Sequence, residues 1–164
     1  MRAIGTTLRP PRDDLHQLGI QALFATSNPS RTNHIDSIIK IFPLEELAIQ
    51  KIVIHKLGQI ARDSPTASEF LVKTLNSASS DHRCETILVL RNNGLISDQH
   101  INKLGKFLSD SDPSVRLESA RTLQQIGVKA TLTISDIERA AASSSDSEVK
   151  AICVMIMKNV KPSR

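Results

Sequence analysis

The stretch LSDSDPSVRLESARTLQQIG, residues 108–127, contains the signals that decide the fold. Its polar residues 110–112 can cap the unpaired N–H groups of a helix, and Pro113 suits the first helical turn. Apolar and small residues then recur at helical spacing until Gly127, a residue type that favours the left-handed conformation at a helix end. The stretch therefore predicts a polar turn followed by an amphipathic helix.

The same pattern recurs along the chain. The segment DPSVR, residues 112–116, returns as DSEVK at residues 146–150, a shift of 34. A shift of 33 in the other direction places residues 83–94 on residues 116–127, and a looser match at a shift of 69 reaches residues 54–58. A fixed period of this length is typical of repeat architectures. Several copies of one unit are therefore expected.

Each unit also contains an earlier helical segment. In residues 97–108, Ser97 and Asp98 form a helix start, and Ile101, Leu104 and Leu108 fall on one face. Equivalent segments occupy residues 31–42, 65–76 and 135–142, the last of which is about one turn shorter. No segment shows strand alternation, so the unit is predicted to be helix, polar turn and helix.

This repeat resembles the HEAT family over residues 31 to 161, most closely at residues 97–127. The positions that carry the resemblance are Leu108, Asp110, Asp112, Val115, Arg116, Ala120, Leu123, Ile126 and Gly127. The resemblance implies an all-α fold, an α-α superhelix in which about four helical hairpins form a solenoid.

In that family the turn Asp and the Arg after the Val commonly form a ladder between neighbouring repeats. The resemblance carries these roles to Asp112 and Arg116, and in the next unit to Asp146 and Lys150. The preceding unit departs from the pattern, because Ser79 stands at the Asp place and His82 at the Val place.

The whole chain, residues 1–164, is expected to be a single domain. Residues 1–30 are interpreted as an N-terminal extension whose residues 15–25 form a helix that caps the first unit, and residues 31–161 as the repeats. No apolar run reaches the length of a membrane span. Two cysteines stand 69 residues apart in different repeats, which is typical of a reducing compartment. We therefore expect a cytoplasmic protein.

The sequence offers little for catalysis. Some HEAT-like enzymes carry His-Glu pairs that hold two irons, but none of the five histidines here is followed by Glu. Gly58, Gly94 and Gly127 each end a helical pattern rather than form a phosphate-binding loop. Cys84 is interpreted as a core residue. We expect no cofactor, no metal and no enzymatic activity, and a HEAT-like enzyme such as a lyase is the remote alternative.

Nucleic-acid binding is the stronger alternative, because the net charge is +4 and many cations fall on the second helices, which line the concave face of HEAT-like solenoids. These cations are Lys51, Lys56, Arg83, Arg91, Arg116, Arg121, Lys150 and Lys158. Glutamates on the same helices, including Glu118 and Glu148, are expected to neutralise some of them. The chain has no Trp or Tyr to stack on bases, so only weak, backbone-directed binding is expected.

The second helices also carry apolar residues at places where the unit at 113–127 has polar ones. Part of this pattern indicates burial between repeats, and part indicates an exposed groove suited to a protein or peptide partner. We predict a non-catalytic interaction scaffold that binds its partner on the concave face. The predicted binding residues are Ile49, Ile52, Lys56, Leu88, Arg91, Arg121 and Met155.

The last helix raises a separate possibility. If the shift of 34 sets its orientation, Ile152 and Ile156 lie on a flanking face where a following repeat would pack, with Met155 beside them. Exposure of these side chains would favour a homodimer or a partner contact at this end. The alternative is that the short preceding helix lets the last helix rotate and bury them.

Overall fold

The computed structural model describes residues 31–160, and the helix expected at residues 15–25 lies outside them. Within the described part the chain is helical and contains no strand, which confirms the all-α prediction. The α-helices are α2 (Arg31–Ile41), α3 (Leu47–Ile60), α4 (Pro65–Leu75), α5 (Ser80–Asn92), α6 (Asp98–Phe107), α7 (Pro113–Ile126), α8 (Ile134–Ser143) and α9 (Ser147–Val160). Two 3-10 segments are η1 (Phe42–Leu44) and η2 (Gly127–Thr133).

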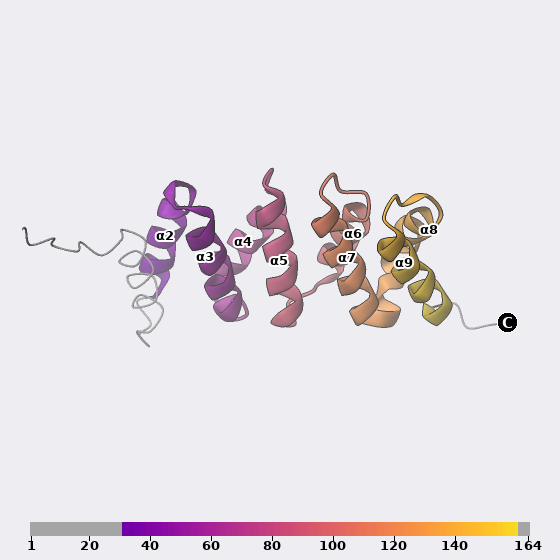
Figure 1. Cartoon of the computed structure of the whole chain (residues 1–164). Helices are drawn as coiled ribbons and strands as arrows, with labels where there is room; N and C mark the ends of the chain where they lie inside the picture. Colours follow the sequence, from indigo (N-terminus) through magenta and orange to yellow (C-terminus); the bar gives the residue numbers. More distant parts are fainter. Residues whose placement is uncertain (1–30, 161–164) are drawn as a thin grey trace, which may run out of the picture.

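The helices form hairpins that stack along one direction (Figure 1). The second helix of each hairpin packs on the next, so that α3, α5, α7 and α9 stand side by side. The first helices α4, α6 and α8 lie behind them. We call the side formed by α3, α5, α7 and α9 the second-helix face.

In α7 the predicted inward stripe forms the core side of the helix. In α7, Val115, Ala120 and Leu123 are fully buried, and Ile126 is half-buried. Spacings of three to five residues place these side chains on one helical face, as the 3.6-residue period requires. Complete burial of an aliphatic side chain of this size stabilises the fold by about 1.5–3 kcal/mol. Ile54 in α3 and Leu90 in α5 are the repeat equivalents of Leu123, and both are buried.

The caps of α7 also follow the sequence signals, with one change of role. The Asp112 carboxylate caps α7 by accepting the backbone N–H groups of Ser114 and Val115, and Pro113 occupies the first turn. Gly127 ends the helix with a φ of 62°, a conformation that side-chain-bearing residues rarely adopt. Asp110 does not cap the helix, because its carboxylate instead accepts the backbone N–H of Asp112 and the guanidinium of Arg83.

Gly58 corrects the sequence interpretation, since it lies inside α3 and does not end it. A Cβ atom at this position would stand 2.0 Å from Cγ1 of Val89 in α5. The missing side chain therefore lets α3 and α5 approach closely. Gly94, by contrast, ends α5 with a φ of 64°, as its position predicted.

Candidate functional site

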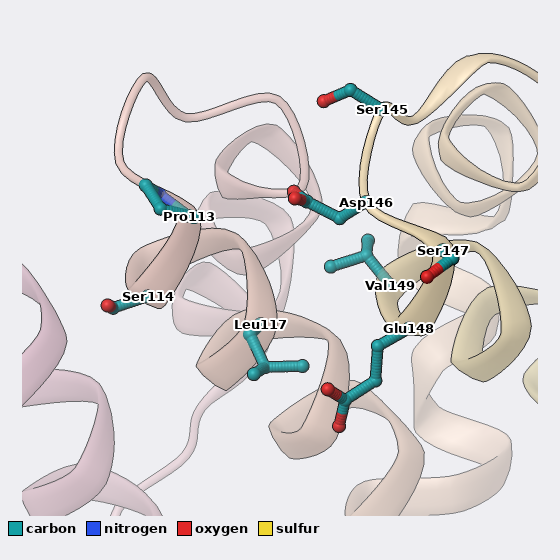
Figure 2. A pocket seen from close by; sticks show the side chains of 8 residues that line it. All are labelled: Pro113, Ser114, Leu117, Ser145, Asp146, Ser147, Glu148 and Val149. Carbon is teal, nitrogen blue, oxygen red and sulfur yellow. The ribbon is translucent and has the colours of Figure 1, made fainter.

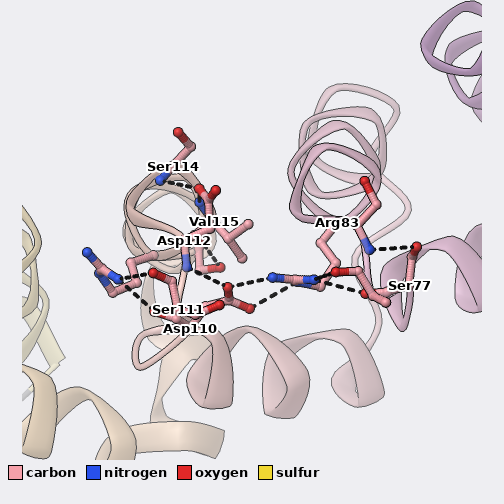
Figure 3. Close-up of polar contacts among 11 residues, drawn as sticks. Ser77, Arg83, Asp110, Ser111, Asp112, Ser114 and Val115 are labelled. Carbon is pink, nitrogen blue, oxygen red and sulfur yellow. Dashed lines mark hydrogen bonds and ion pairs between the residues drawn. The ribbon is translucent and has the colours of Figure 1, made fainter. Parts of the chain in front are cut away.

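A buried arginine joins the second and third hairpins near the N-terminal end of α5. The Arg83 guanidinium donates to both oxygens of Asp110, at 2.6 and 3.0 Å, and to the carbonyl oxygens of Ser77 and Ala78 at 2.9 Å (Figure 3). The Arg83 side chain is only 11% exposed and that of Asp110 only 8%. Arg83 thus organises the turn before its own helix and binds the turn of the next repeat.

Arg116 repeats this arrangement one unit later. Its guanidinium pairs with Asp146 and also donates to the carbonyl oxygens of Asp110 and Ser111. The hydrogen bond to Asp146 raises the pKa of Arg116. The ladder implied by the HEAT resemblance is therefore present, but Asp110 and Asp146 accept the arginines, while Asp112 serves as the helix cap. Lys150, the other residue assigned to the ladder, forms no ion pair within residues 31–160.

Further along the second-helix face, an ion-pair chain crosses three helices. Arg91 of α5 donates to Glu118 of α7 at 2.8 Å, and Glu118 also accepts from Arg121 at 3.0 Å. Arg121 continues the chain to Glu148 of α9 at 2.8 Å. Hydrogen bonds to Glu148 and Glu118 raise the pKa of Arg121. The predicted neutralisation of second-helix cations by glutamates is confirmed at Glu118 and Glu148.

The remaining second-helix cations divide into paired and unpaired groups. Lys51 pairs with Asp81 at 2.7 Å, and this hydrogen bond raises the pKa of Lys51. Within residues 31–160, Lys56, Lys150 and Lys158 form no ion pair. Most of the cations named from the sequence are therefore already bound to carboxylates of the same chain.

A cleft of about 420 Å³ opens between the N-terminal turns of α7 and α9 (Figure 2). Leu117 supplies apolar surface from α7, while Asp146 and Glu148 project from the α9 side (Figure 2). We call this space the α7–α9 cleft. Its lining is Pro113, Ser114, Leu117, Ser145, Asp146, Ser147, Glu148 and Val149.

A second cleft, of about 280 Å³, occupies the equivalent place one repeat earlier. We call it the α5–α7 cleft, and its lining is Lys51, Ser80, Asp81, Cys84, Glu85, Leu88, Asp112 and Ser114. The repeat shift of 33 places Cys84 on Leu117, so the same structural position supplies apolar surface in both clefts. A hydrogen bond from the Ser80 hydroxyl, supported by backbone N–H groups, lowers the pKa of Asp112.

The apolar binding residues predicted from the sequence separate into three environments. Ile49 is only 5% exposed, so its assignment to an exposed groove is wrong. Ile52 and Leu88 are half-buried, and Leu88 lines the α5–α7 cleft. Met155 is 50% exposed, with its sulfur 4.0 Å from the Gln124 amide nitrogen. The apolar surface of the second-helix face is therefore discontinuous.

The polar binding residues differ in availability. Lys56 is half-buried and unpaired within the described residues. The Arg91 side chain is 17% exposed and held by Glu118, whereas Arg121 is 46% exposed and held at the surface by two glutamates. Any partner that uses these arginines must share or displace their existing carboxylates.

The expected exposure at the C-terminal end is wrong. Ile152 is 8% exposed and Ile156 only 2%, so both belong to the core. The inward stripe of α9 is Val149, Ile152, Cys153 and Ile156, at spacings of three and four residues. Relative to the orientation expected from the shift of 34, α9 is thus turned about its axis. A contact at this end remains a prediction, but these isoleucines do not supply its surface.

Two histidines and both cysteines pack or form hydrogen bonds within the fold. His100 accepts the backbone N–H of Ser97 at 3.1 Å, while Nε2 of His82 lies 2.7 Å from the Gln50 amide oxygen. Desolvation by burial lowers the pKa of both histidines. Burial raises the pKa of Cys84 and of Cys153 to about 11. Among residues 31–160, no three His, Cys, Asp or Glu side chains are grouped so that they could hold a metal ion.

Sequence reasoning missed several residues that line the clefts. Glu85 and Leu117 were not assigned to a site, and Cys84 was interpreted as core although it also lines a cleft. The repeat alignment contained part of the signal, because Cys84 and Leu117 are equivalent positions. It could not show that clefts open beside the N-terminal turns of the second helices, which depends on packing between units.

Comparison with known proteins agrees with this architecture. The family model described as HEAT repeats matches residues 68–158, more than half of the chain. Neither the curated proteins nor the solved structures gave a match. Within residues 31–160, none of the helices combines the length and apolar character that a membrane span requires. The matched residues cover the hairpins whose ladder and stripes are described above, and the chain belongs to the HEAT-repeat family.

Proposed function

We propose that this chain is a non-catalytic scaffold that binds a protein or peptide partner on its second-helix face. HEAT repeats are generally protein-interaction scaffolds and are typically non-catalytic. The observation that supports this face is the pair of repeat-equivalent clefts, each combining apolar lining with carboxylates and hydroxyl groups. Such a mixture of apolar and polar groups suits recognition of protein side chains.

The exposed side chains on this face provide the points of contact. Met155 presents an unbranched, adaptable apolar side chain, which is common at protein-binding surfaces. Leu88 adds a half-buried apolar wall in the α5–α7 cleft. Arg121 and Glu148 lie at the surface, where polar contacts contribute more to specificity than to affinity.

Nucleic-acid binding is the weaker alternative. Arg83, Arg91, Arg116 and Arg121 are held by carboxylates of the same chain, so phosphate contacts would have to compete with existing ion pairs. If phosphate contacts nevertheless drove binding, affinity would fall steeply as salt increases. Absence of any shift of duplex or single-stranded probes at about 50 mM salt would exclude this alternative.

The test of the scaffold proposal compares two double variants. Leu88→Ser with Met155→Ser alters the second-helix face, whereas Val128→Ser with Leu132→Ser alters exposed apolar residues of η2. Affinity capture from the native host identifies candidate partners, and calorimetry with each purified partner then measures binding.

We expect a partner that binds the wild type and the η2 variant but binds the second-helix variant at least tenfold more weakly. A factor of ten corresponds to about 1.4 kcal/mol, which truncation of two contacting apolar side chains readily exceeds. Circular dichroism establishes that each variant remains helical. A folded second-helix variant that retains full affinity for every partner would refute this face as the binding surface.

A further inference from the structure

The boundaries between hairpins are not equivalent. Between the first and second hairpins, α2 packs on α4 and α3 packs on α5, so both layers are in contact. Between the third and fourth, α6 contacts α8, α7 contacts α9, and η2 packs against α6, α7 and α9. Between the second and third, α5 packs on α7, but α4 and α6 make less contact than α2 makes with α4 or α6 with α8.

The connection across this middle boundary is correspondingly slight. Gly94 is exposed and adopts a φ of 64°, and only residues 95–97 separate it from the start of α6. Arg83–Asp110 crosses the boundary near the N-terminal end of α5, and Arg91–Glu118 crosses it near the C-terminal end. The boundary thus consists of one helix pair that is fastened by an ion pair toward each end.

We propose that the α5–α7 contact is a hinge between a rigid block of α2–α5 and a rigid block of α6–α9. A boundary that is packed mainly along one pair of helices permits rotation about that pair, because the first-helix layer supplies little opposing contact. The ion pairs Arg83–Asp110 and Arg91–Glu118 set the angle between the two blocks. The other boundaries resist the same rotation because both of their layers are packed.

The hinge acts directly on the α5–α7 cleft. Ser80, Cys84 and Leu88 line it from one block, while Asp112 and Ser114 line it from the other. Rotation therefore widens or narrows this cleft. If the proposed function is correct, a partner seated there selects one angle and so sets the relative position of the two blocks, although the hinge itself does not depend on that function.

Ion pairs alone do not distinguish the hinge from the next boundary. Arg116–Asp146 and Arg121–Glu148 cross between α7 and α9 in the same manner. Salt screens the exposed Arg121–Glu148 pair more than the two hinge pairs, whose side chains are only 8–17% exposed. The screening length falls from about 10 Å at 0.1 M to about 3 Å at 1 M. A hinge at this place requires that the α5–α7 boundary, where the first helices make little contact, is more mobile than the α7–α9 boundary.

Distances between spin labels in the first-helix layer test this requirement. Cysteines replace exposed Ser68 in α4 and Lys106 in α6 for the hinge pair, and Lys106 and Ala142 in α8 for the control pair. Cys84 is replaced by Ala, while the fully buried Cys153 is kept. Pulsed electron paramagnetic resonance then gives the distance distribution of each pair at about 0.1 M and about 1 M NaCl.

We expect the hinge pair to have the broader distribution at both salt concentrations, while the control pair stays narrow even though its Arg121–Glu148 ion pair is screened more strongly. Equal widths and equal salt responses for the two pairs would overturn the hinge. Broadening of both pairs together would also overturn it, because it would indicate a uniformly flexible solenoid.

A matched pair of substitutions removes the salt effect from the comparison. Glu118→Gln weakens the hinge pair with Arg91 and also the contact of Arg121 with Glu118 inside α7, while Arg121 keeps Glu148. Glu148→Gln weakens the pair with Arg121 at the next boundary. We expect Glu118→Gln to broaden the Ser68–Lys106 distribution at low salt and Glu148→Gln to leave the Lys106–Ala142 distribution unchanged. If Glu118→Gln fails to fold, the salt titration of the otherwise unaltered protein still decides the question.

Discussion

The segments that follow α5 and α7 begin alike and then diverge. Gly94 and Gly127 end these helices with φ values of 64° and 62°. After Gly94 only residues 95–97 precede α6, whereas Gly127 begins the 3-10 segment η2, which packs on α6, α7 and α9. The same kind of helix stop is thus followed by a three-residue connection, residues 95–97, after α5 and by the packed 3-10 segment η2 after α7.

This difference shows that one repeat pattern can join its units by different physical means. At the α7–α9 boundary, Ala130 and Thr133 of η2 are buried, so packing accompanies the ion pairs. Gly105 of α6 belongs to the same close contact, because a Cβ there would stand 1.7 Å from Oγ1 of Thr133. The α5–α7 boundary has no comparable packed segment among the described residues and relies more on Arg83 and Arg91.

The largest expected effect is the unequal cost of removing equivalent arginines. Arg83→Met leaves the nearly buried Asp110 carboxylate without its guanidinium, and we expect a loss of about 3 kcal/mol in unfolding free energy. Arg116→Met leaves Asp146, whose side chain is 31% exposed, so water can compensate and the loss should be about 1 kcal/mol. Urea denaturation followed by circular dichroism measures both.

Equal losses of unfolding free energy in the two variants, or a larger loss in Arg116→Met, would contradict the difference between the two boundaries. A lower m-value in Arg83→Met, with a separate transition for part of the helix content, would strengthen the evidence that the two boundaries differ. That result would mean that the two blocks no longer unfold together.

The second prediction addresses the packed boundary. Gly105→Ala places a methyl group against Thr133 and the Asp136 carboxylate, so η2 must move away from α6. We expect a net destabilisation of about 1–2 kcal/mol, because overpacking outweighs the helix propensity that Ala gains over Gly. Lys106→Ala, at the exposed neighbouring position of the same helix, is the control and should change stability little. A Gly105→Ala protein as stable as this control would show that η2 does not constrain the boundary.

The features that depend on local residue pattern could be predicted from the sequence. Inward stripes, the caps at Asp112 and Pro113, and the helix stops at Gly94 and Gly127 all follow from residue type and spacing. The parts that depend on packing between units were not predictable. Gly58 was mistaken for a helix stop because only the neighbouring Val89 reveals why a side chain is excluded.

The orientation of α9 was missed for a related reason. A shift of 34 aligns its first residues with α7 and predicted Val154 and Met157 as inward residues, but these two are only half-buried. Ile152, which stands at the place of Glu118, is buried instead, and Ile156 is buried as Thr122 is in α7. Likewise, sequence spacing identified acidic residues in the turn but could not distinguish the cap, Asp112, from the acceptor of Arg83, Asp110. Those roles depend on which side chain faces the preceding repeat.

The smallest expected effect concerns acid and the start of α6, immediately after the three-residue connection. His100 accepts the Ser97 N–H at 3.1 Å, and its pKa is lowered below 6.5 by burial. The unfolded chain therefore binds the proton more readily. The contribution of neutral His100 to the free energy of unfolding is complete above about pH 6.5 and is lost as the pH falls through the lower folded pKa.

His100→Gln keeps an acceptor at this position of the capping box but cannot titrate. Between about pH 7 and pH 5, we expect a smaller loss of unfolding free energy in His100→Gln than in the wild type. Because His82 also has a lowered pKa and remains in the variant, part of the acid sensitivity should persist. Identical pH profiles for His100→Gln and the wild type would show that the α6 cap does not contribute to the acid sensitivity of this boundary.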